Sequence, residues 1–179
     1  AEELYKKAMQ IRERVLGEDH PATATIYNNL ALVYQAQGKY REAEELYKKA
    51  MQIRERVLGE DHPATATSYN NLAGVYQAQG RYREAEELYK KAIQIIERVL
   101  GEDHPTTAIS YNNLAGMYRR QRDNKKALLY YLKAFKVLRF KFGVDHSNTQ
   151  IVHENMEFAY SEWNPHGDFE QWLEKKIKE

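Results

Sequence analysis

The sequence contains no cysteine, which excludes disulfides, thiolate nucleophiles and thiolate metal ligands. This absence fits a reducing compartment, and we expect a cytoplasmic protein. No apolar run approaches the roughly 20 residues that span a bilayer. The formal net charge of the 179 residues is only +1, so neither nucleic acid nor a membrane is an expected partner. With 42% hydrophobic residues, the sequence predicts one packed domain.

Motifs for catalysis and cofactor binding are also absent. The sequence has no glycine-rich phosphate loop, no HExxH zinc motif and no serine with a recognisable general base. Its many carboxylates recur at regular positions, which is typical of solvated helix faces. We therefore expect no enzymatic activity, no cofactor and no metal site.

What the sequence does contain is a repeat of 42 residues. Residues 1–42 and 43–84 differ at only three positions, and residues 85–126 differ from the second copy at twelve. Residues 127–168 keep only a skeleton of the pattern. Repeats of about 20–50 residues are typical of solenoids, in which each unit packs on its neighbours. A residue needed for stacking recurs in every copy, whereas a residue needed at a single site has no reason to recur.

Each repeat predicts two antiparallel helices. In the unit that begins at Gly17, an Asp-His-Pro turn is typical of a helix start, where the aspartate can accept backbone amides. Gly38 is typical of a helix end. Apolar residues spaced by three, four and seven predict one buried face on each helix. These faces consist of Tyr27, Leu30, Ala31 and Tyr34 in the first helix, and of Ala43, Leu46, Tyr47, Ala50, Ile53, Val57 and Leu58 in the second.

These positions resemble the tetratricopeptide repeat, with tyrosine in place of its usual tryptophan. The 42-residue period and the strings "VLGEDHP" and "NNLA" are similar to repeats of the kinesin light chain type. The resemblance implies an all-α, right-handed superhelical solenoid of antiparallel helix pairs, with about eight helices. It also implies a non-catalytic scaffold for protein–protein interaction.

The repeat frame predicts the organisation of the chain. We expect residues 1–16 to form the second helix of a truncated repeat, residues 17–146 to hold the regular repeats, and residues 147–179 to form a divergent repeat with a capping helix. The predicted helix pairs span residues 21–58, 63–100 and 105–142. Because the first helix has no preceding partner, we also expect weak self-association there.

The resemblance further implies that the first helices line a concave groove that binds a peptide or partner segment. The expected groove residues are Thr25, Asn28, Asn29, Leu32, Gln35, Thr67, Asn70, Asn71, Gln77, Asn112, Asn113, Arg119 and Arg120. The second asparagine of each "NNLA" string matches the family position that contacts the ligand backbone, and its amide offers both a donor and an acceptor. The alternative is that these asparagines bond to the adjacent repeat. Threonine at positions 25 and 67, where acidic-ligand grooves of the family carry lysine, argues against a carboxylate clamp in the first two repeats.

Charge breaks the repetition in the segment Arg119–Lys141. Nine basic residues and one acidic residue give this segment a net charge of +8, against −7 for the rest of the chain. Its first two arginines replace glutamine and alanine at groove positions, which favours an acidic peptide as partner. Nucleic acid is a weaker candidate because the patch has no obvious stacking platform. The alternative is a drifted repeat with solvated charges.

Histidine and tyrosine recur in register. We interpret His20, His62, His104 and His146 as helix-start residues, because one histidine per helix pair forms a ladder and not a metal cluster. The recurring tyrosines predict interlocking packing, with an aromatic ligand cage as the alternative. Two other functions stay open: a structural or consensus-like array with no dedicated ligand, which the near-identity of the first two copies favours, and a regulatory domain attached to an enzyme.

Overall fold

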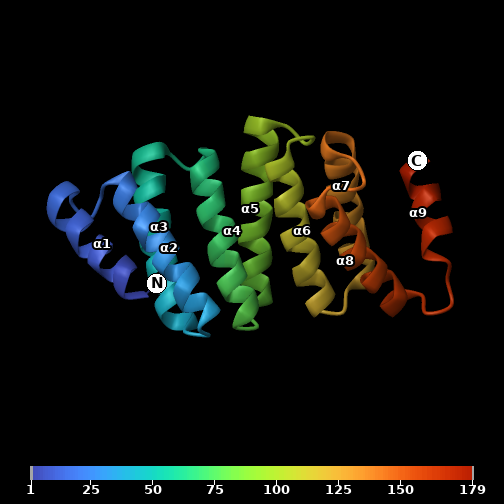
Figure 1. The fold of residues 1–179 in the computed structure, drawn as a ribbon, viewed down its shortest axis with the longest axis horizontal. Helices are drawn as coiled ribbons and strands as arrows, with labels where there is room; N and C mark the ends of the chain where they lie inside the picture. The colour runs from blue at the N-terminus through green and yellow to red at the C-terminus, as the bar shows by residue number, and fades with distance from the viewer. Residues whose placement is uncertain (1, 179) are drawn as a thin grey trace. The chain divides into compact units, whose positions relative to one another are not determined.

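The computed structural model describes residues 2–178, and nine α-helices make up the regular structure of this part (Figure 1). Their bounds are α1 Glu2–Leu16, α2 Pro21–Ala36, α3 Tyr40–Leu58, α4 Pro63–Ala78, α5 Tyr82–Leu100, α6 Pro105–Arg120, α7 Asn124–Phe142, α8 Ser147–Trp163 and α9 Phe169–Lys178. The predicted all-α class is confirmed, with nine helices in the described residues where about eight were expected. None of these helices is long and apolar enough to cross a membrane.

The chain divides within α5 into two compact units. Unit 1 spans Ala1–Ile95 and unit 2 spans Ile96–Glu179. In unit 1, α1 packs on α2, α2 on α3, and α3 on α4. In unit 2, α6 packs on α7 and α7 on α8, while α8 also contacts α6 and α9. Within each unit the helices therefore pack in chain order, as stacked helix pairs require.

The first helix of each repeat begins with a histidine cap. His20 Nδ1 accepts a hydrogen bond from the amide of Ala22 at 3.1 Å, and the same bond recurs in the next three repeats at 3.1–3.2 Å. The interpretation of the histidines as helix-start residues is confirmed. The expectation that the neighbouring aspartate caps the helix is wrong, because the imidazole already occupies that place. Asp19 forms an ion pair with Arg56 instead.

A buried threonine closes each of the first three turns into these helices. The hydroxyl of Thr23 donates to the carbonyl oxygen of Gly17 at 2.8 Å, and Thr65 and Thr107 form the same bond with their own glycines. Gly17 has a φ of 88°, a conformation that favours glycine. The turn is therefore fixed at both ends, by a glycine that permits it and a threonine that bonds across it.

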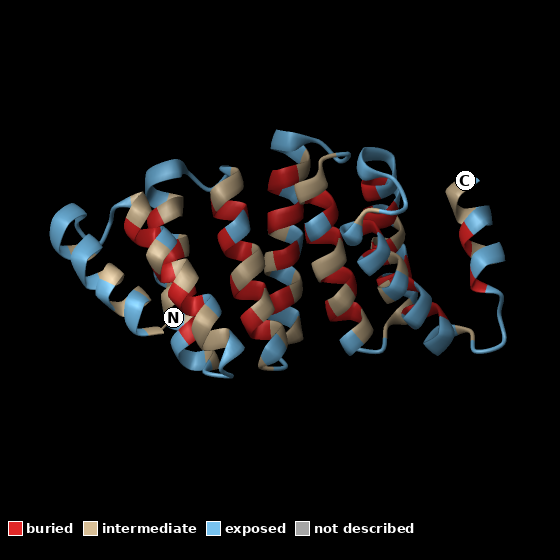
Figure 2. Ribbon diagram, in the orientation of Figure 1, coloured by how far each residue is buried: buried red, intermediate tan, exposed pale blue. Residues whose placement is uncertain are grey.

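The buried residues lie mainly on the parts of each helix that face a neighbouring helix (Figure 2). Tyr27 belongs to a core cluster with Ala24, Ala50 and Ile53. Its hydroxyl reaches the edge of the packing and donates to Glu13 at 2.7 Å. Equivalent tyrosines form the same bond in the next two repeats. The predicted tyrosine packing is therefore confirmed, because the rings are buried against helices and the hydroxyls are already bonded.

Two parts of the predicted buried faces are exposed. Val57 and Leu58 are 48% and 37% exposed, so their assignment to the inward face is wrong. They lie in the last turn of α3, which no described helix covers. In α1 no described residue is buried, and Leu4 is 73% exposed. Self-association through this helix stays a prediction.

Candidate peptide-binding face

In unit 1 the groove asparagines bond to each other across repeats. Asn71 Nδ2 on α4 donates to Asn28 Oδ1 on α2 at 2.7 Å. The first asparagine of one repeat is thus held by the second asparagine of the next. Asn29 and Asn70 are half-buried beside them, and Asn70 Oδ1 has no hydrogen-bond partner among residues 2–178. This geometry matches the inter-repeat alternative for Asn71, because its donor is used within the protein.

The predicted glutamines of unit 1 are also occupied. Gln35 Oε1 accepts a hydrogen bond from the hydroxyl of Tyr47 at 3.2 Å, and Gln77 Oε1 accepts one from Tyr89 at 3.0 Å. A Cβ placed on Gly74 would lie 3.6 Å from both Gln35 Nε2 and the Tyr89 hydroxyl. Polar atoms therefore surround the glycine, and the glutamines link each first helix to the second helix behind it.

The other predicted residues of unit 1 make few contacts with neighbouring helices. The hydroxyl of Thr25 bonds back to the carbonyl of Pro21 at 3.3 Å, and Thr67 bonds to Pro63 at 3.1 Å. Leu32 is 48% exposed. These threonines satisfy their hydroxyls within one helical turn and offer no positive charge. The expectation that no carboxylate clamp forms here stays a prediction.

In unit 2 the corresponding face of α6 carries polar atoms that lack hydrogen-bond partners. Within residues 2–178, neither Asn112 Oδ1 nor Arg119 Nε has a hydrogen-bond partner, although both atoms are buried. The two residues are seven positions apart, so they lie on one face of α6, two turns from each other. Asn113 is half-buried and Arg120 is exposed on the same helix.

A residue not predicted for the site, Phe158 of α8, completes this face. The guanidinium carbon of Arg119 lies 4.9 Å from the centre of the Phe158 ring, a distance suited to a cation–π contact. The ring itself is 52% exposed. Phe158 occupies the repeat position that Leu32 and Gly74 occupy earlier, so alignment of the fourth copy could have revealed it.

Arg119 also acts on the tyrosine behind it. Burial raises the pKa of Tyr131, and the nearby positive charge of Arg119 offsets part of that rise. A Cβ placed on Gly116 would lie 3.6 Å from the Tyr131 hydroxyl. The arginine therefore stands where Gln77 stands in unit 1, between a groove glycine and a buried tyrosine, but it brings a positive charge.

The structure thus brings together two subsets of the predicted residues, one in each unit. Asn28, Asn71 and the glutamines of unit 1 form internal bonds. Asn112 and Arg119 of unit 2 share a face with Phe158. Among residues 2–178, no group of three or more histidine or carboxylate side chains is arranged to hold a metal ion.

Sequence comparison relates most of the chain to known repeats. The profile described as "Tetratricopeptide repeat" matches residues 1–56, 22–95 and 66–139. The human protein named "Tetratricopeptide repeat protein 19, mitochondrial" is 44% identical over 43 residues, which are 24% of this chain. The match covers only 11% of that curated relative.

Solved structures are similar over almost the whole chain. BtubC (BKLC) from P. vanneervenii has a TM-score of 0.80 and 27% identity, covering 99% of this chain and 70% of its own. The nearly identical TPR-like repeats of a proposed kinesin light chain from Podosopora anserina have a TM-score of 0.76 and 25% identity, covering 99% and 83%. RapI, at 17% identity and a TM-score of 0.75, covers 97% and 59% and shares the fold alone.

Proposed function

Because the chain belongs to the tetratricopeptide repeat family, we propose that it is a non-catalytic, cytoplasmic protein-binding module whose ligand face lies in unit 2. Its ligand is an extended peptide with a carboxylate, held on α6 and α8. Asn112 and Asn113 bond to the peptide backbone, and Arg119 and Arg120 bind the carboxylate. The ring of Phe158 positions the guanidinium of Arg119 through a cation–π contact.

The observation that carries this proposal is Arg119 Nε, a buried donor without a hydrogen-bond partner among the described residues; Asn112 Oδ1 also lacks a partner, as does Asn70 Oδ1 at the equivalent position of unit 1. A buried polar atom without a partner costs about 1–3 kcal/mol. A change of rotamer toward a peptide would give Arg119 and Asn112 partners and remove this cost. Gln77 holds the position of Arg119 in unit 1 and accepts a hydrogen bond from Tyr89 at 3.0 Å, so unit 1 has no guanidinium at this place.

Charge favours an acidic ligand segment at this place. Guanidinium groups form charge-assisted, often bidentate, hydrogen bonds with carboxylates. Arg120 is exposed, and Arg119 is half-buried with its guanidinium over the Phe158 ring. Glu162 of α8 stands one repeat after Arg120, so the arginine pair of α6 does not recur in the fourth repeat. The carboxylate of the peptide is therefore expected near the C-terminal turn of α6.

A second function is favoured for unit 1. Four of its groove residues bond internally: Asn71 bonds to Asn28, and Gln35 and Gln77 bond to tyrosines. We propose that unit 1 is a structural array that supports the fold and has no dedicated ligand. In this proposal unit 1 is the ligand-free array and unit 2 binds the peptide.

The test is fluorescence anisotropy with a labelled acidic peptide at two salt concentrations. The double variant Arg119→Glu and Arg120→Glu is expected to weaken binding by about tenfold or more, because both charge-assisted bonds become repulsive. The matched control is Arg83→Glu, a charge reversal of an exposed arginine in unit 1, which is expected to change binding by less than about twofold. Equal losses in the two proteins would reject the site.

A further inference from the structure

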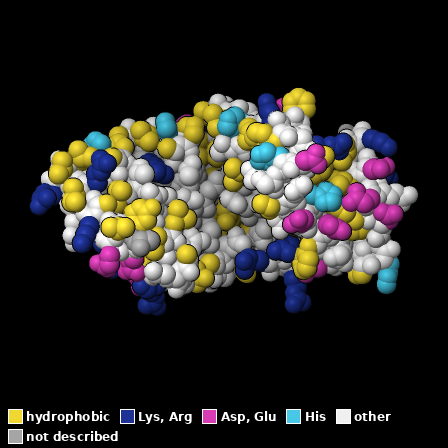
Figure 3. All heavy atoms as spheres, in the orientation of Figure 1, with side chains coloured by type: hydrophobic (Ala, Val, Ile, Leu, Met, Phe, Trp, Pro, Cys, Tyr) yellow, Lys and Arg dark blue, Asp and Glu magenta, His cyan; other side chains and the backbone are white. Residues whose placement is uncertain are grey.

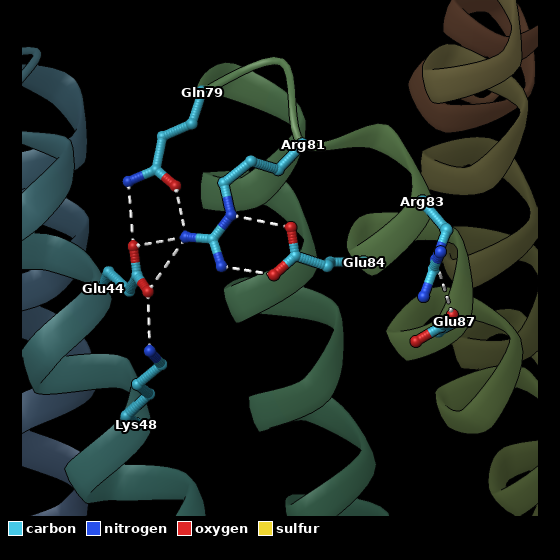
Figure 4. A network of polar contacts seen from close by, with 7 residues as sticks. All are labelled: Glu44, Lys48, Gln79, Arg81, Arg83, Glu84 and Glu87. Atoms are coloured by element: carbon cyan, nitrogen blue, oxygen red, sulfur yellow. Dashed lines mark hydrogen bonds and ion pairs between the residues drawn. The ribbon is translucent and has the colours of Figure 1, made fainter.

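Unit 1 contains a charged network where the second helix of one repeat meets the next repeat (Figure 4). Glu44 on α3 accepts hydrogen bonds from Lys48 at 2.6 Å and from Gln79 at 2.9 Å. Arg81 bonds to the same carboxylate at 3.0 and 3.1 Å and also bonds to Glu84. Only 14% of the Glu44 side chain is exposed. The position therefore holds a partly buried carboxylate that three donors satisfy.

This network keeps Glu44 ionised. Burial alone would raise its pKa, but the hydrogen bonds from Lys48, Gln79 and Arg81 outweigh burial and lower the pKa to about 2. Arg81 additionally lies over the ring of Tyr76, 4.0 Å from its centre. The surface around Glu44 is consequently polar and charged, and it forms no apolar pocket.

In unit 2 the same repeat positions are apolar. Leu128 and Leu132 of α7 replace the glutamate and lysine, and Trp163 at the end of α8 replaces the glutamine. These side chains, together with Trp172 of α9, line a cavity of about 390 Å³. Leu129 lies on its edge and is 53% exposed. One repeat has therefore exchanged a closed charged network for an open apolar pocket.

The rim of this pocket is positively charged. Lys125 and Lys136 of α7 and Lys176 of α9 line it, and no acidic residue does. In the part of the chain that the structure describes, neither Lys125 nor Lys136 forms an ion pair. Lys136 replaces a glutamine of the earlier repeats, Gln52 and Gln94, so its charge does not come from the repeat.

The opposite charge lies on another side of α9. A separate cavity of about 550 Å³ between α7, α8 and α9 is lined by Glu154, Glu170 and Glu174 together with His153 and Arg139. Acidic side chains accordingly gather over α8 and α9 on the face of unit 2 seen in Figure 3. The lysine-rimmed pocket is thus distinct in charge from its neighbour, although both use α9 as a wall.

A polar recess continues the pocket on one side. Lys125 and Trp163 line both the pocket and the recess, which also contains Asn124 and the acidic residues Asp123 and Glu162. Asn124 Oδ1 is buried and has no hydrogen-bond partner among the described residues. Asparagine replaces tyrosine at this position of the repeat. An unsatisfied acceptor next to an apolar floor suits the backbone N–H of a peptide and not a simple hydrocarbon chain.

We propose that this pocket is a second docking site, which binds a peptide segment that presents one leucine-sized apolar side chain between carboxylates. The apolar side chain enters between Leu128, Leu132 and the two tryptophans. The flanking carboxylates bind Lys125 and Lys136 on the rim, and a backbone amide donates to Asn124. Residues of α7, α9 and the last position of α8 build this site, and it shares no residue with the face of Asn112, Arg119 and Phe158.

The experiment uses the tryptophans as reporters, because the chain has only two and both line the pocket. The probe is a capped, tryptophan-free peptide of about ten residues with a central leucine flanked by aspartates. Titration is expected to change tryptophan emission to a saturable end point. Two matched peptides, one with asparagine for aspartate and one with serine for leucine, are each expected to bind at least about fivefold more weakly.

Variants separate the pocket from its surroundings. Leu129→Glu restores the residue of the earlier repeats at an exposed position and is expected to weaken the probe about tenfold without lowering the melting temperature. Lys136→Gln restores the glutamine of the earlier repeats and is expected to weaken binding of the probe about threefold. The double variant Arg119→Glu and Arg120→Glu is expected to leave the tryptophan response unchanged, so failure here is distinguishable from failure of the face on α6 and α8.

Three outcomes would overturn the proposal. The first is the absence of a saturable emission change with the probe. The second is equal binding of the serine-substituted or asparagine-substituted peptide, which would show that the apolar floor or the lysine rim plays no part. The third is an emission change that depends on protein concentration alone and accompanies dimer formation in sedimentation. That outcome would mean that a second copy of the chain, and not a peptide, occupies the pocket.

Discussion

The face of α2 and α4 in unit 1 and the face of α6 and α8 in unit 2 share one helical frame but use their polar groups differently. In unit 1, Asn71 bonds to Asn28 and the glutamines bond to tyrosines. In unit 2, Asn112 and Arg119 each hold a buried atom without a partner, and Arg119 lies over an exposed ring. Stacking explains these bonds of the first face, although Asn70 Oδ1 there is buried without a hydrogen-bond partner among the described residues, as Asn112 Oδ1 is. The second face adds a guanidinium whose place over an exposed ring stacking does not require.

The same difference recurs behind the grooves. Glu44 of unit 1 sits in a network of ion pairs, whereas Leu128 of unit 2 stands at the same position beside two tryptophans. The repeats therefore differ in sequence at positions where packing between helices does not require one particular residue.

The buried tyrosines should behave alike in both units. Tyr47→Ala in unit 1 and Tyr131→Ala in unit 2 are each expected to reduce the free energy of unfolding by about 3–5 kcal/mol, because both rings are at most 1% exposed. Urea unfolding measures the change. A loss below about 1 kcal/mol in either protein would mean that the tyrosine ladder is not a shared core.

Glu44 should make unit 1 sensitive to acid. Its pKa is lowered in the folded state, so its contribution is present above the ordinary carboxylate pKa and is lost as the pH falls from about 4.5 toward 2. Glu44→Gln is expected to cost about 1.5–3 kcal/mol at pH 7, the range for hydrogen bonds to a charged group, and less at pH 2. Unfolding curves across this pH range check both statements.

The control for acid sensitivity is Glu45→Gln, an exposed carboxylate on the next position of α3. It is expected to change stability by less than about 0.5 kcal/mol at either pH. If Glu44→Gln and the control gave the same pH profile, the network would have no special role in unit 1.

The turns between helices offer a reciprocal test. Gly80 has a φ of 77°, and Arg122 occupies the equivalent turn of the next repeat with a φ of 62°. A side chain in this left-handed region costs about 1–2 kcal/mol, partly offset by the flexibility that glycine adds to the unfolded chain. Gly80→Arg is expected to destabilise, and Arg122→Gly to stabilise, each by about 1 kcal/mol. Differential scanning calorimetry would reject the account if both changes had the same sign.

The asparagines should give the smallest and most specific contrast. Asn71→Ala removes the donor to Asn28 and is expected to cost about 0.5–1.5 kcal/mol. Asn112→Ala removes an acceptor that has no partner and is expected to be neutral or slightly stabilising. Chemical denaturation of the two variants side by side decides this. Equal losses would mean that Asn112 is satisfied in solution.

The fold could be predicted from the sequence because its determinants repeat. Gly17, the histidine caps and the tyrosine spacing each recur, and each predicts a local structure without reference to the rest of the chain. The threonine bond across the turn was not predictable from periodicity, because it depends on the path of the loop and not on a helix face. Val57 was misplaced for a related reason, since helical spacing does not tell where a neighbouring helix stops covering it.

The site could be predicted only in outline. Periodicity placed Asn28, Asn71 and Asn112 on one helix face, but it could not tell which of them bond to each other. That depends on the distance between helices. Phe158 and the pocket around Leu128 were not identified as sites, because alignment of the fourth copy shows which residues changed but not which of them lie together. Only the packed structure puts the two tryptophans beside those leucines.

The central claim is that a ligand binds where the repeats differ, on α6 and α8, and not where they are nearly identical. The most direct test is a titration of the ¹⁵N-labelled protein with the labelled acidic peptide, followed by amide chemical shifts. The account predicts that shift changes concentrate in residues 105–120 and 147–163, with α2 and α4 unchanged. Equal changes along α2 and α4, or larger ones at Asn28 and Asn71 than at Asn112 and Arg119, would contradict it.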